Sequence, residues 1–404
     1  MQTSIIEQLR NTAAGKEADA ILRSCVHCGF CTATCPTYQL LGDELDGPRG
    51  RIYLIKQMLE GNEVTEKTQL HLDRCLTCRS CETTCPSGVK YGRLVEIGRE
   101  VVEERVGRSW PQRVIRKLLR MITPYPARLK TLVRLGGLFK PLLPVALKAK
   151  LPNTAAHQPW PAPRHARRML VLQGCAQEAV KPSTNAATAR VLDRLGISLI
   201  AAPEAGCCGA VSYHLNAHEE GLNFMRRNID AWWPAIEAGA EAIVMTASGC
   251  GAMVKDYGEL LRHDPAYAAK AARVASLTKD LSEILAKEDL SVLGKRGNGR
   301  RIAFQTPCTL QHAQKLNGVV EGLLRQVGFE LTPVPDGHLC CGSAGTYSVL
   351  QSELSQRLLQ NKLAALESGK PELIATANIG CHMHLETQAK RPVKHWIEVL
   401  DAAL

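Results

Sequence analysis

The chain's 404 residues are enough for two or three domains with cores of their own, and 45% hydrophobic and 22% charged residues are typical of a soluble globular protein. Only 4% of the residues are aromatic, which argues against recognition of nucleic acid through stacked bases. The net charge of +11 arises in one segment: Arg105–Arg168 holds 15 Lys or Arg and no acidic residue, so the rest of the chain carries −4. No apolar run reaches the length of a membrane span, about 18 residues, and the N-terminus lacks the apolar core of a secretory signal.

Residues 1–104 are helical in pattern and carry two copies of Cys-x-x-Cys-x-x-Cys-x-x-x-Cys-Pro, fifty residues apart. The copies are Cys25, Cys28, Cys31, Cys35 with Pro36, and Cys75, Cys78, Cys81, Cys85 with Pro86. This is the ligand pattern of a two-cluster bacterial-type ferredoxin, in which the fourth cysteine of each run binds the other cluster. The sequence therefore predicts two [4Fe-4S] clusters, one held by Cys25, Cys28, Cys31 and Cys85, the other by Cys75, Cys78, Cys81 and Cys35.

Other uses of these cysteines explain the spacing less well. A zinc site built from two Cys-x-x-Cys knuckles leaves the third and fourth cysteines of each run without a role. Disulfide scaffolds belong to small secreted domains, whereas sixteen cysteines without a secretory signal indicate the reducing cytoplasm and metal binding. Between the runs, an amphipathic helix is expected to end near Gly61. His27 is a candidate donor to a cluster or a solvent-facing side chain, and Arg49 and Arg51 either offset cluster charge or form surface pairs.

Residues 105–168 form a basic connector that contains nine prolines, with short helices expected around Val114–Met121 and Leu129–Phe139. Mixed basic and apolar residues favour contact with an anionic membrane surface. A solvated linker and a docking surface for an acidic partner are the alternatives.

Residues 169–404 are an internal duplication. Four cysteines of the first copy recur in the second, at offsets of 133 or 131 residues: Cys175, Cys207, Cys208 and Cys250, then Cys308, Cys340, Cys341 and Cys381. Strands and helices alternate in both copies, which predicts two α/β units with mostly parallel sheets over 169–296 and 297–404. Besides the strand that leads to Cys175 or Cys308, the expected strands are Ser198–Ala201, Ala242–Thr246, Glu330–Pro333 and Leu373–Thr376, and the expected helices include Ala186–Leu195 and Gln314–Val327.

All eight cysteines of the duplication follow predicted strands, at the sheet edge where α/β proteins bind ligands. Each set of four is therefore a candidate site for an additional iron-sulfur cluster or zinc; buried structural thiols and thiol redox chemistry are the alternatives. His312 and His384, close to Cys308 and Cys381 in sequence, are candidate further ligands and make the second set the stronger candidate for metal; a solvated side chain is the alternative for His384.

The C-terminal half resembles the Cys-Cys-Gly (CCG) domain of heterodisulfide reductases, anaerobic glycerol-3-phosphate dehydrogenases and lactate-utilisation proteins. The whole order resembles the iron-sulfur subunits of bacterial glycolate oxidase, in residues 25–57, 75–88, 206–221, 228–243 and 338–347. One departure concerns the end of each repeat. The fullest CCG pattern ends in Cys-x-x-Cys, but here Met253 and His384 stand where its last cysteine would be, so the fifth thiolate of a non-cubane cluster is missing.

This resemblance implies an α+β protein in which a helical ferredoxin-type domain precedes two α/β CCG domains. It also implies the electron relay of a dehydrogenase that oxidises glycolate to glyoxylate and passes electrons to a quinone. We expect FAD on a partner subunit and no catalytic residue in this chain, because nucleotide-binding glycine motifs are missing. We also expect no nucleic-acid partner, and a cytoplasmic location at the inner face of the membrane.

Relatives of other classes share the same cysteine patterns. The alternatives from these relatives are the equivalent subunit of an anaerobic glycerol-3-phosphate or D-lactate dehydrogenase and a heterodisulfide-reductase-like thiol redox protein. A further alternative is a non-enzymatic protein whose basic connector binds nucleic acid.

Overall fold

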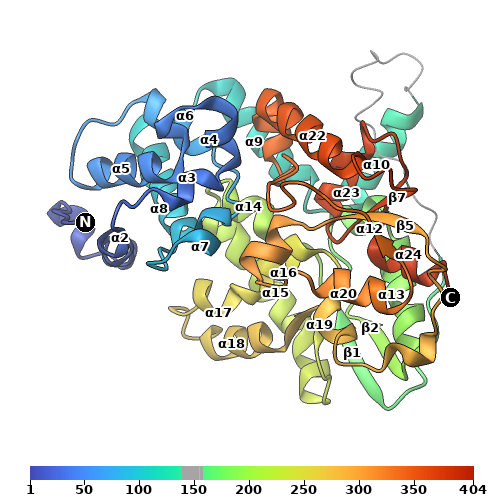
Figure 1. Cartoon of the computed structure of the whole chain (residues 1–404). Coiled ribbons are helices and arrows are strands. Elements are labelled where there is room, and N and C mark those ends of the chain that lie inside the picture. The colour runs from blue at the N-terminus through green and yellow to red at the C-terminus, as the bar shows by residue number, and fades with distance from the viewer. Residues whose placement is uncertain (139–153, 155–157) are drawn as a thin grey trace. The chain divides into compact units, whose positions relative to one another are not determined.

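The computed structural model describes residues 1–138, 154 and 158–404 (Figure 1). Contacts divide the chain into two units. The first contact unit comprises Met1–Arg116 and His338–Lys362, and the second comprises Lys117–Gly337 and Leu363–Leu404. The segment His338–Lys362 therefore packs with the N-terminal helices, although its sequence belongs to the second repeat predicted over 297–404.

Helices build the N-terminal part of the first contact unit, as the sequence predicted. They are α1 (Glu7–Arg10), α2 (Ala13–Ser24), α3 (Phe30–Ala33), α4 (Pro36–Leu41), α5 (Pro48–Leu59), α6 (Glu66–Asp73), α7 (Ser80–Thr84) and α8 (Tyr91–Val106). The expected amphipathic helix between the cysteine runs is α5, which ends two residues before Gly61. Fully buried Leu22, Ile55 and Leu94 join α2, α5 and α8 in one apolar core, which holds the cysteine loops in place.

Two four-stranded parallel sheets lie in the second contact unit, with the same topology. The first has the order β2-β1-β3-β4 and the second β6-β5-β7-β8. Their strands are β1 (Arg167–Val171), β2 (Ile197–Ala201), β3 (Ile243–Met245), β4 (Thr278–Asp280), β5 (Arg301–Gln305), β6 (Glu330–Leu331), β7 (Leu373–Thr376) and β8 (Val393–His395). The prediction of two repeated parallel α/β units is confirmed.

Helices connect the parallel strands. In the first repeat they are α12 (Ala176–Val180), α13 (Ser183–Arg194), α14 (Ala210–His214), α15 (His218–Glu237), α16 (Ser248–Lys255), α17 (Tyr257–Leu260), α18 (Ala268–Leu277) and α19 (Leu281–Leu285). In the second they are α20 (Val319–Gln326), α21 (Tyr347–Leu350), α22 (Ser352–Glu367), α23 (Ile379–Glu386) and α24 (Trp396–Asp401). Helix α20 is shorter than the predicted Gln314–Val327 because a π-helical turn, Thr309–Ala313, precedes it and left-handed Gly318 caps its start.

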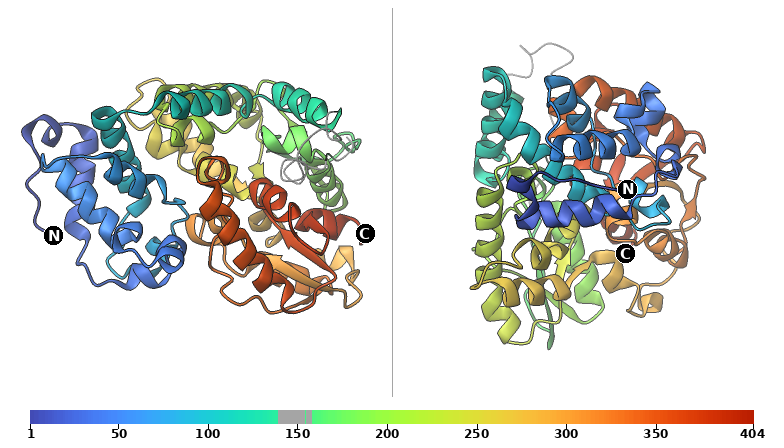
Figure 2. Two further views of the ribbon diagram at one scale, coloured as in Figure 1. Left: turned by 90° about the horizontal axis from the view of Figure 1, so that it is seen from above. Right: turned by 90° about the vertical axis from the view of Figure 1, so that its left-hand side faces the viewer.

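The two sheets share one core within the second contact unit; Figure 2 shows their strands from two further directions. Val171 of β1, Phe304 of β5 and Trp396 of α24 are each at most 5% exposed and belong to this core. Where the repeats meet, His395 Nε2 donates a hydrogen bond to the Thr246 carbonyl at 2.9 Å. Burial lowers the pKa of His395 to about 4, so the contact forms with a neutral imidazole at neutral pH.

The basic connector forms α9 (Trp110–Ile122) and α10 (Pro126–Leu138), close to the expected Val114–Met121 and Leu129–Phe139. Phe139 and three of its nine prolines lie outside the described residues. On α9, Arg116 pairs with Asp73 and Arg120 with Glu220, so these basic groups face protein. Large apolar side chains of the two helices are exposed instead: Trp110, Ile115, Leu118, Met121, Leu132, Leu135 and Leu138.

Among the described residues, every helix is too short or too polar to cross a membrane.

Candidate metal centres

Both ferredoxin-type loops have the same backbone conformation. His27 and Gly29 in the first loop, and Thr77 and Arg79 in the second, all have positive φ angles between 52° and 86°. Left-handed residues in such loops turn backbone N–H groups toward a common centre, where an anion is stabilised. One of these N–H groups, that of Thr77, donates to Cys75 Sγ at 3.4 Å. The backbone is thus shaped for a negatively charged group among the thiols.

The fourth cysteine of each run lies with the first three of the other. One pocket is lined by the first thiol group, Cys25, Cys28, Cys31 and Cys85, and Cys81 also borders it. The second thiol group is Cys75, Cys78, Cys81 and Cys35. Burial raises the pKa of Cys81 well above its usual value, and the other three thiols of that group raise it further. The two groups are neighbours within the first contact unit.

Their chemistry fits two [4Fe-4S] clusters. Eight thiols converge in two groups of four, the number of thiolates that each cubane takes. Burial raises the pKa of Cys31 to about 11, so this thiol becomes a thiolate at neutral pH only when a metal replaces its proton. Cys28 is exposed, whereas Cys35, Cys75 and Cys81 are buried, so the first thiol group has more contact with solvent than the second.

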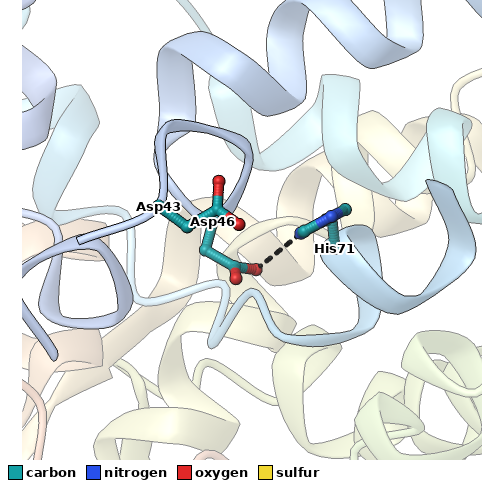
Figure 3. Close-up of side chains that lie close together, drawn as sticks. All are labelled: Asp43, Asp46 and His71. Atoms are coloured by element: carbon teal, nitrogen blue, oxygen red, sulfur yellow. Dashed lines mark hydrogen bonds and ion pairs between the residues drawn. The ribbon is translucent and has the colours of Figure 1, made fainter. Parts of the chain in front are cut away.

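A buried ion-pair network lies beside the second thiol group. The Asp46 carboxylate contacts Arg74 Nη1 at 2.8 Å, His71 Nδ1 at 3.1 Å and Arg51 Nη2 at 3.4 Å. Figure 3 shows Asp43, Asp46 and His71, which lie close enough to share a cation. Two guanidinium groups already neutralise Asp46, however, and the Asp43 carboxylate accepts from the Leu45 N–H, so we do not assign a metal site to the trio.

The sequence left two alternative roles for each of three residues near the cysteine runs. The imidazole Nε2 of His27 contacts Met1 Sδ, and the residue borders the pocket of the first thiol group. Arg49 pairs with Glu44 at 2.6 Å and its side chain is 39% exposed, so it forms a surface ion pair. Arg51, by contrast, is only 1% exposed and lies inside the protein.

Four cysteines of the first CCG repeat also converge. Cys175 follows β1, Cys207 and Cys208 follow β2, and Cys250 lies in the first turn of α16. We call these four cysteines the first CCG pocket. Hydrogen bonds from Cys207 and Cys250 lower the pKa of Cys208 well below its usual value. Hydrogen bonding raises the pKa of Cys207 and of Cys250, which shows that the sulfurs lie in contact with one another. Such a set of contacting sulfurs has the donors that zinc or an iron-sulfur cluster requires.

Both Cys-Cys-Gly turns depend on their glycine. Gly209 and Gly342 have φ angles of +89° and +87°. The N–H of Gly209 donates to Cys207 Sγ, and that of Gly342 donates to Cys340 Sγ. A Cβ at Gly209 would lie 2.7 Å from the Gly221 carbonyl oxygen, and one at Gly342 would lie 2.5 Å from that of Ser355. No other residue type fits this approach to a neighbouring helix.

The cysteines of the second repeat belong to different contact units. Cys340 and Cys341 lie in the first unit, Cys308 and Cys381 in the second. Near the Cys340 turn, Tyr347 donates a hydrogen bond to the Arg74 carbonyl at 3.2 Å. Burial raises the pKa of Tyr347, and Cys75 and Cys340 both add to this rise.

Two histidines of the second repeat are not solvated. His312 is 8% and His384 7% exposed, so the solvent-facing alternative given for His384 is wrong. Both histidines lie in the same repeat as Cys308 and Cys381, and all four side chains are buried.

Comparison with known proteins matches the chain over its full length. It is 62% identical over 405 residues to the glycolate oxidase iron-sulfur subunit of Escherichia coli (strain K12), covering 100% of this chain and 99% of that protein. The chain belongs to the family of glycolate oxidase iron-sulfur subunits. The probable member from Bacillus subtilis (strain 168) is 31% identical, over 96% of this chain and 93% of its own.

Parts of the chain also match the models of two domain families. Residues 21–89 match the 4Fe-4S dicluster domain, which supports two [4Fe-4S] clusters, and residues 169–255 and 302–386 match the cysteine-rich CCG domain. Lactate utilization protein A of Bacillus licheniformis is 31% identical over 56% of this chain and 96% of its own length.

Several residues around the thiols of this family member were not predicted from sequence. Asn228 Nδ2 donates to the Cys207 carbonyl at 2.8 Å, and the Tyr257 hydroxyl donates to that of Cys208 at 2.9 Å. Thr37 Oγ1 lies 3.3 Å from Cys35 Sγ. These side chains reach the cysteines through tertiary packing, and no local motif marks them.

Proposed function

We propose that this chain is the electron relay of a flavin-dependent dehydrogenase that oxidises glycolate to glyoxylate. Family membership supports the activity, and the pairing of eight thiols in two neighbouring groups supports the relay. The first thiol group, Cys25, Cys28, Cys31 and Cys85, would hold one [4Fe-4S] cluster. The second, Cys75, Cys78, Cys81 and Cys35, would hold the other.

The chain's own residues position, bury and stabilise these groups. Iron-sulfur clusters exchange single electrons, so the hydride of glycolate must first go to an organic acceptor, FAD, on a partner subunit. Left-handed loop residues such as Thr77 direct N–H groups to the sulfurs, which favours the thiolate form. The buried second thiol group is shielded from water, and its immediate neighbour, the first group, provides a short route for an electron.

Glycolate-dependent dye reduction by the complete complex tests this function. The chain, co-purified anaerobically with its flavoprotein partner, should support glycolate oxidation with an artificial electron acceptor that receives electrons from the relay. Cys75→Ser should reduce that rate at least tenfold, because its cluster loses a ligand, while glycolate still reduces the partner's flavin.

Alternative substrates provide the decisive comparison. The partial match to lactate utilization protein A makes D-lactate the second candidate, and glycerol 3-phosphate the third. A complex that turns over either compound faster than glycolate would reassign the substrate, whereas unchanged dye reduction in Cys75→Ser would contradict the relay.

We further propose that α9 and α10 hold the chain at the cytoplasmic face of the membrane, where a quinone accepts the electrons. The exposed apolar side chains of these helices, Trp110 and Leu138 above all, lie in a segment with 15 basic and no acidic residues. An interfacial helix buries such side chains between lipid headgroups, and each nearby basic residue contributes about 1 kcal/mol to binding an anionic surface.

Co-sedimentation with liposomes tests this attachment. Binding should require anionic lipid and weaken several-fold as salt rises, because salt screens exposed charges. Leu118→Glu should reduce binding further, since it places an acidic group on the exposed apolar face; Val292→Glu, an exposed apolar position in the CCG region, is the matched control. Equal binding to neutral vesicles would contradict the electrostatic part of the proposal.

A further inference from the structure

Arg51 of α5 is a buried cation that lies close to the second thiol group. Its side chain is 1% exposed. Its Nε donates to the His71 carbonyl at 2.7 Å, and both of its Nη atoms donate to Thr37 Oγ1 at 3.2 Å. A guanidinium with five donors rarely lies so deep without an anion nearby.

Thr37 connects this guanidinium to a cysteine. Its hydroxyl lies 3.3 Å from Cys35 Sγ and 2.8 Å from the Asp46 carbonyl, to which it donates. Because the two N–H groups of Arg51 polarise the hydroxyl oxygen, its proton becomes a better hydrogen-bond donor. When Cys35 is a thiolate, the sulfur is an acceptor that competes for this proton.

The charge of Arg51 is not cancelled by its surroundings. Asp46 pairs with Arg51 at 3.4 Å, but Arg74 binds that same carboxylate more closely, at 2.8 Å. Burial lowers the pKa of Arg51, but the ionisable groups around it, Cys75, Cys35 and Asp46 among them, raise it by more, so the net shift is upward. Arg51 therefore stays positive beside two cysteines of the second thiol group.

Arg49, which borders the pocket of the first thiol group, has different surroundings from Arg51. Arg49, two residues earlier on α5, has a 39% exposed side chain and pairs with Glu44 at 2.6 Å. Water and that carboxylate screen its charge. Arg49 is therefore a natural control for Arg51.

We propose that Arg51, acting directly and through Thr37, raises the reduction potential of the cluster at the second thiol group. Each reduction adds a negative charge in a buried place, which is costly unless a positive charge lies close by. Hydrogen bonds toward the cysteine sulfurs act in the same direction. Arg51 is thus a positioning residue. Its positive charge keeps the cluster at the buried second thiol group reducible by the cluster at the more exposed first thiol group. The inference rests on the cluster assignment made above.

Redox titration of the anaerobic full-length chain, followed by electron paramagnetic resonance, tests the role of Arg51. In Arg51→Gln, the reduction equilibrium of the second cluster should shift at least tenfold toward the oxidised form, which corresponds to about 59 mV for one electron. Arg51→Lys should restore most of that shift because it keeps the charge. Thr37→Val should lower the potential less, and Arg49→Gln should leave the second cluster within a twofold change.

Iron content and the two cluster signals are measured in every variant. An unchanged potential in an Arg51→Gln protein that holds both clusters would overturn the inference. Should Arg51→Gln fail to assemble, Thr37→Val decides: an unchanged second cluster there overturns it, and a lowered potential supports it. A wild-type protein without two [4Fe-4S] signals would instead overturn the cluster assignment itself.

Discussion

Replacing Cys35 by Ser is expected to damage the cluster at Cys75, Cys78 and Cys81, which lie 40 to 46 residues further along the chain, and to leave the other intact. The reciprocal variant, Cys85→Ser, is expected to damage the cluster at Cys25, Cys28 and Cys31. The reason is the crossed placement: Cys35 lies among the thiols of the second run and Cys85 lines the pocket of the first. Serine is a poor ligand for iron, so each variant should lose roughly half of the cluster signal.

Spectra of single and double variants distinguish the crossed from the uncrossed arrangement. Combining Cys35→Ser with Cys78→Ser should damage one cluster only, because both ligands belong to the second thiol group. Combining Cys35→Ser with Cys28→Ser should damage both. Loss of cluster signal confined to the run that carries the substitution would contradict the crossed assignment. Asn216→Ser, outside the thiol groups, controls for cluster loss during purification.

Cysteine spacing allowed the candidate metal centres to be predicted because ligand chemistry fixes the spacing locally. A loop that wraps three thiols around one cluster has few solutions, so the motif carries the information by itself. The same holds for the Cys-Cys-Gly turns, where Gly209 and Gly342 meet a steric demand that only glycine satisfies. The alternation of strands and helices likewise predicted the two parallel sheets, which the structure confirms.

What could not be predicted depends on tertiary packing. Strands β4 and β8 have three residues each and follow the last cysteine of their repeats, so neither a periodic pattern nor a cysteine motif marks them. The contact of Arg51 with Thr37 joins residues 14 positions apart, and that of Arg74 with Asp46 joins residues 28 apart. Sequence left Arg49 and Arg51 equivalent, yet the packing of α5 exposes one and buries the other.

Repeat symmetry also misleads where packing overrides it. The segment His338–Lys362 carries the second Cys-Cys-Gly turn and matches its counterpart in the first repeat. Its contacts nevertheless place it with the N-terminal helices, partly through the hydrogen bond from Tyr347 to the Arg74 carbonyl. A duplicated sequence can therefore serve two different surroundings, and the two CCG repeats need not have the same role.

The first CCG pocket is expected to hold zinc or an additional iron-sulfur cluster, which shields its thiols from alkylation in the anaerobic protein. After chelation, Cys208 should react first, because hydrogen bonds from Cys207 and Cys250 lower its pKa and so favour its thiolate form. Cys207 and Cys250 should react more slowly, since their pKa values are raised. Mass spectrometry of the alkylated peptides measures this order.

Metal content separates a metal site from buried structural thiols. Cys208→Ser should lose the additional metal while both [4Fe-4S] clusters remain, because the pocket shares no cysteine with either thiol group. Structural thiols, by contrast, would react equally slowly before and after chelation, since burial alone would then limit access. An intact anaerobic mass equal to the chain plus two cubanes would end the expectation of metal in either CCG repeat and leave the relay as a two-cluster path.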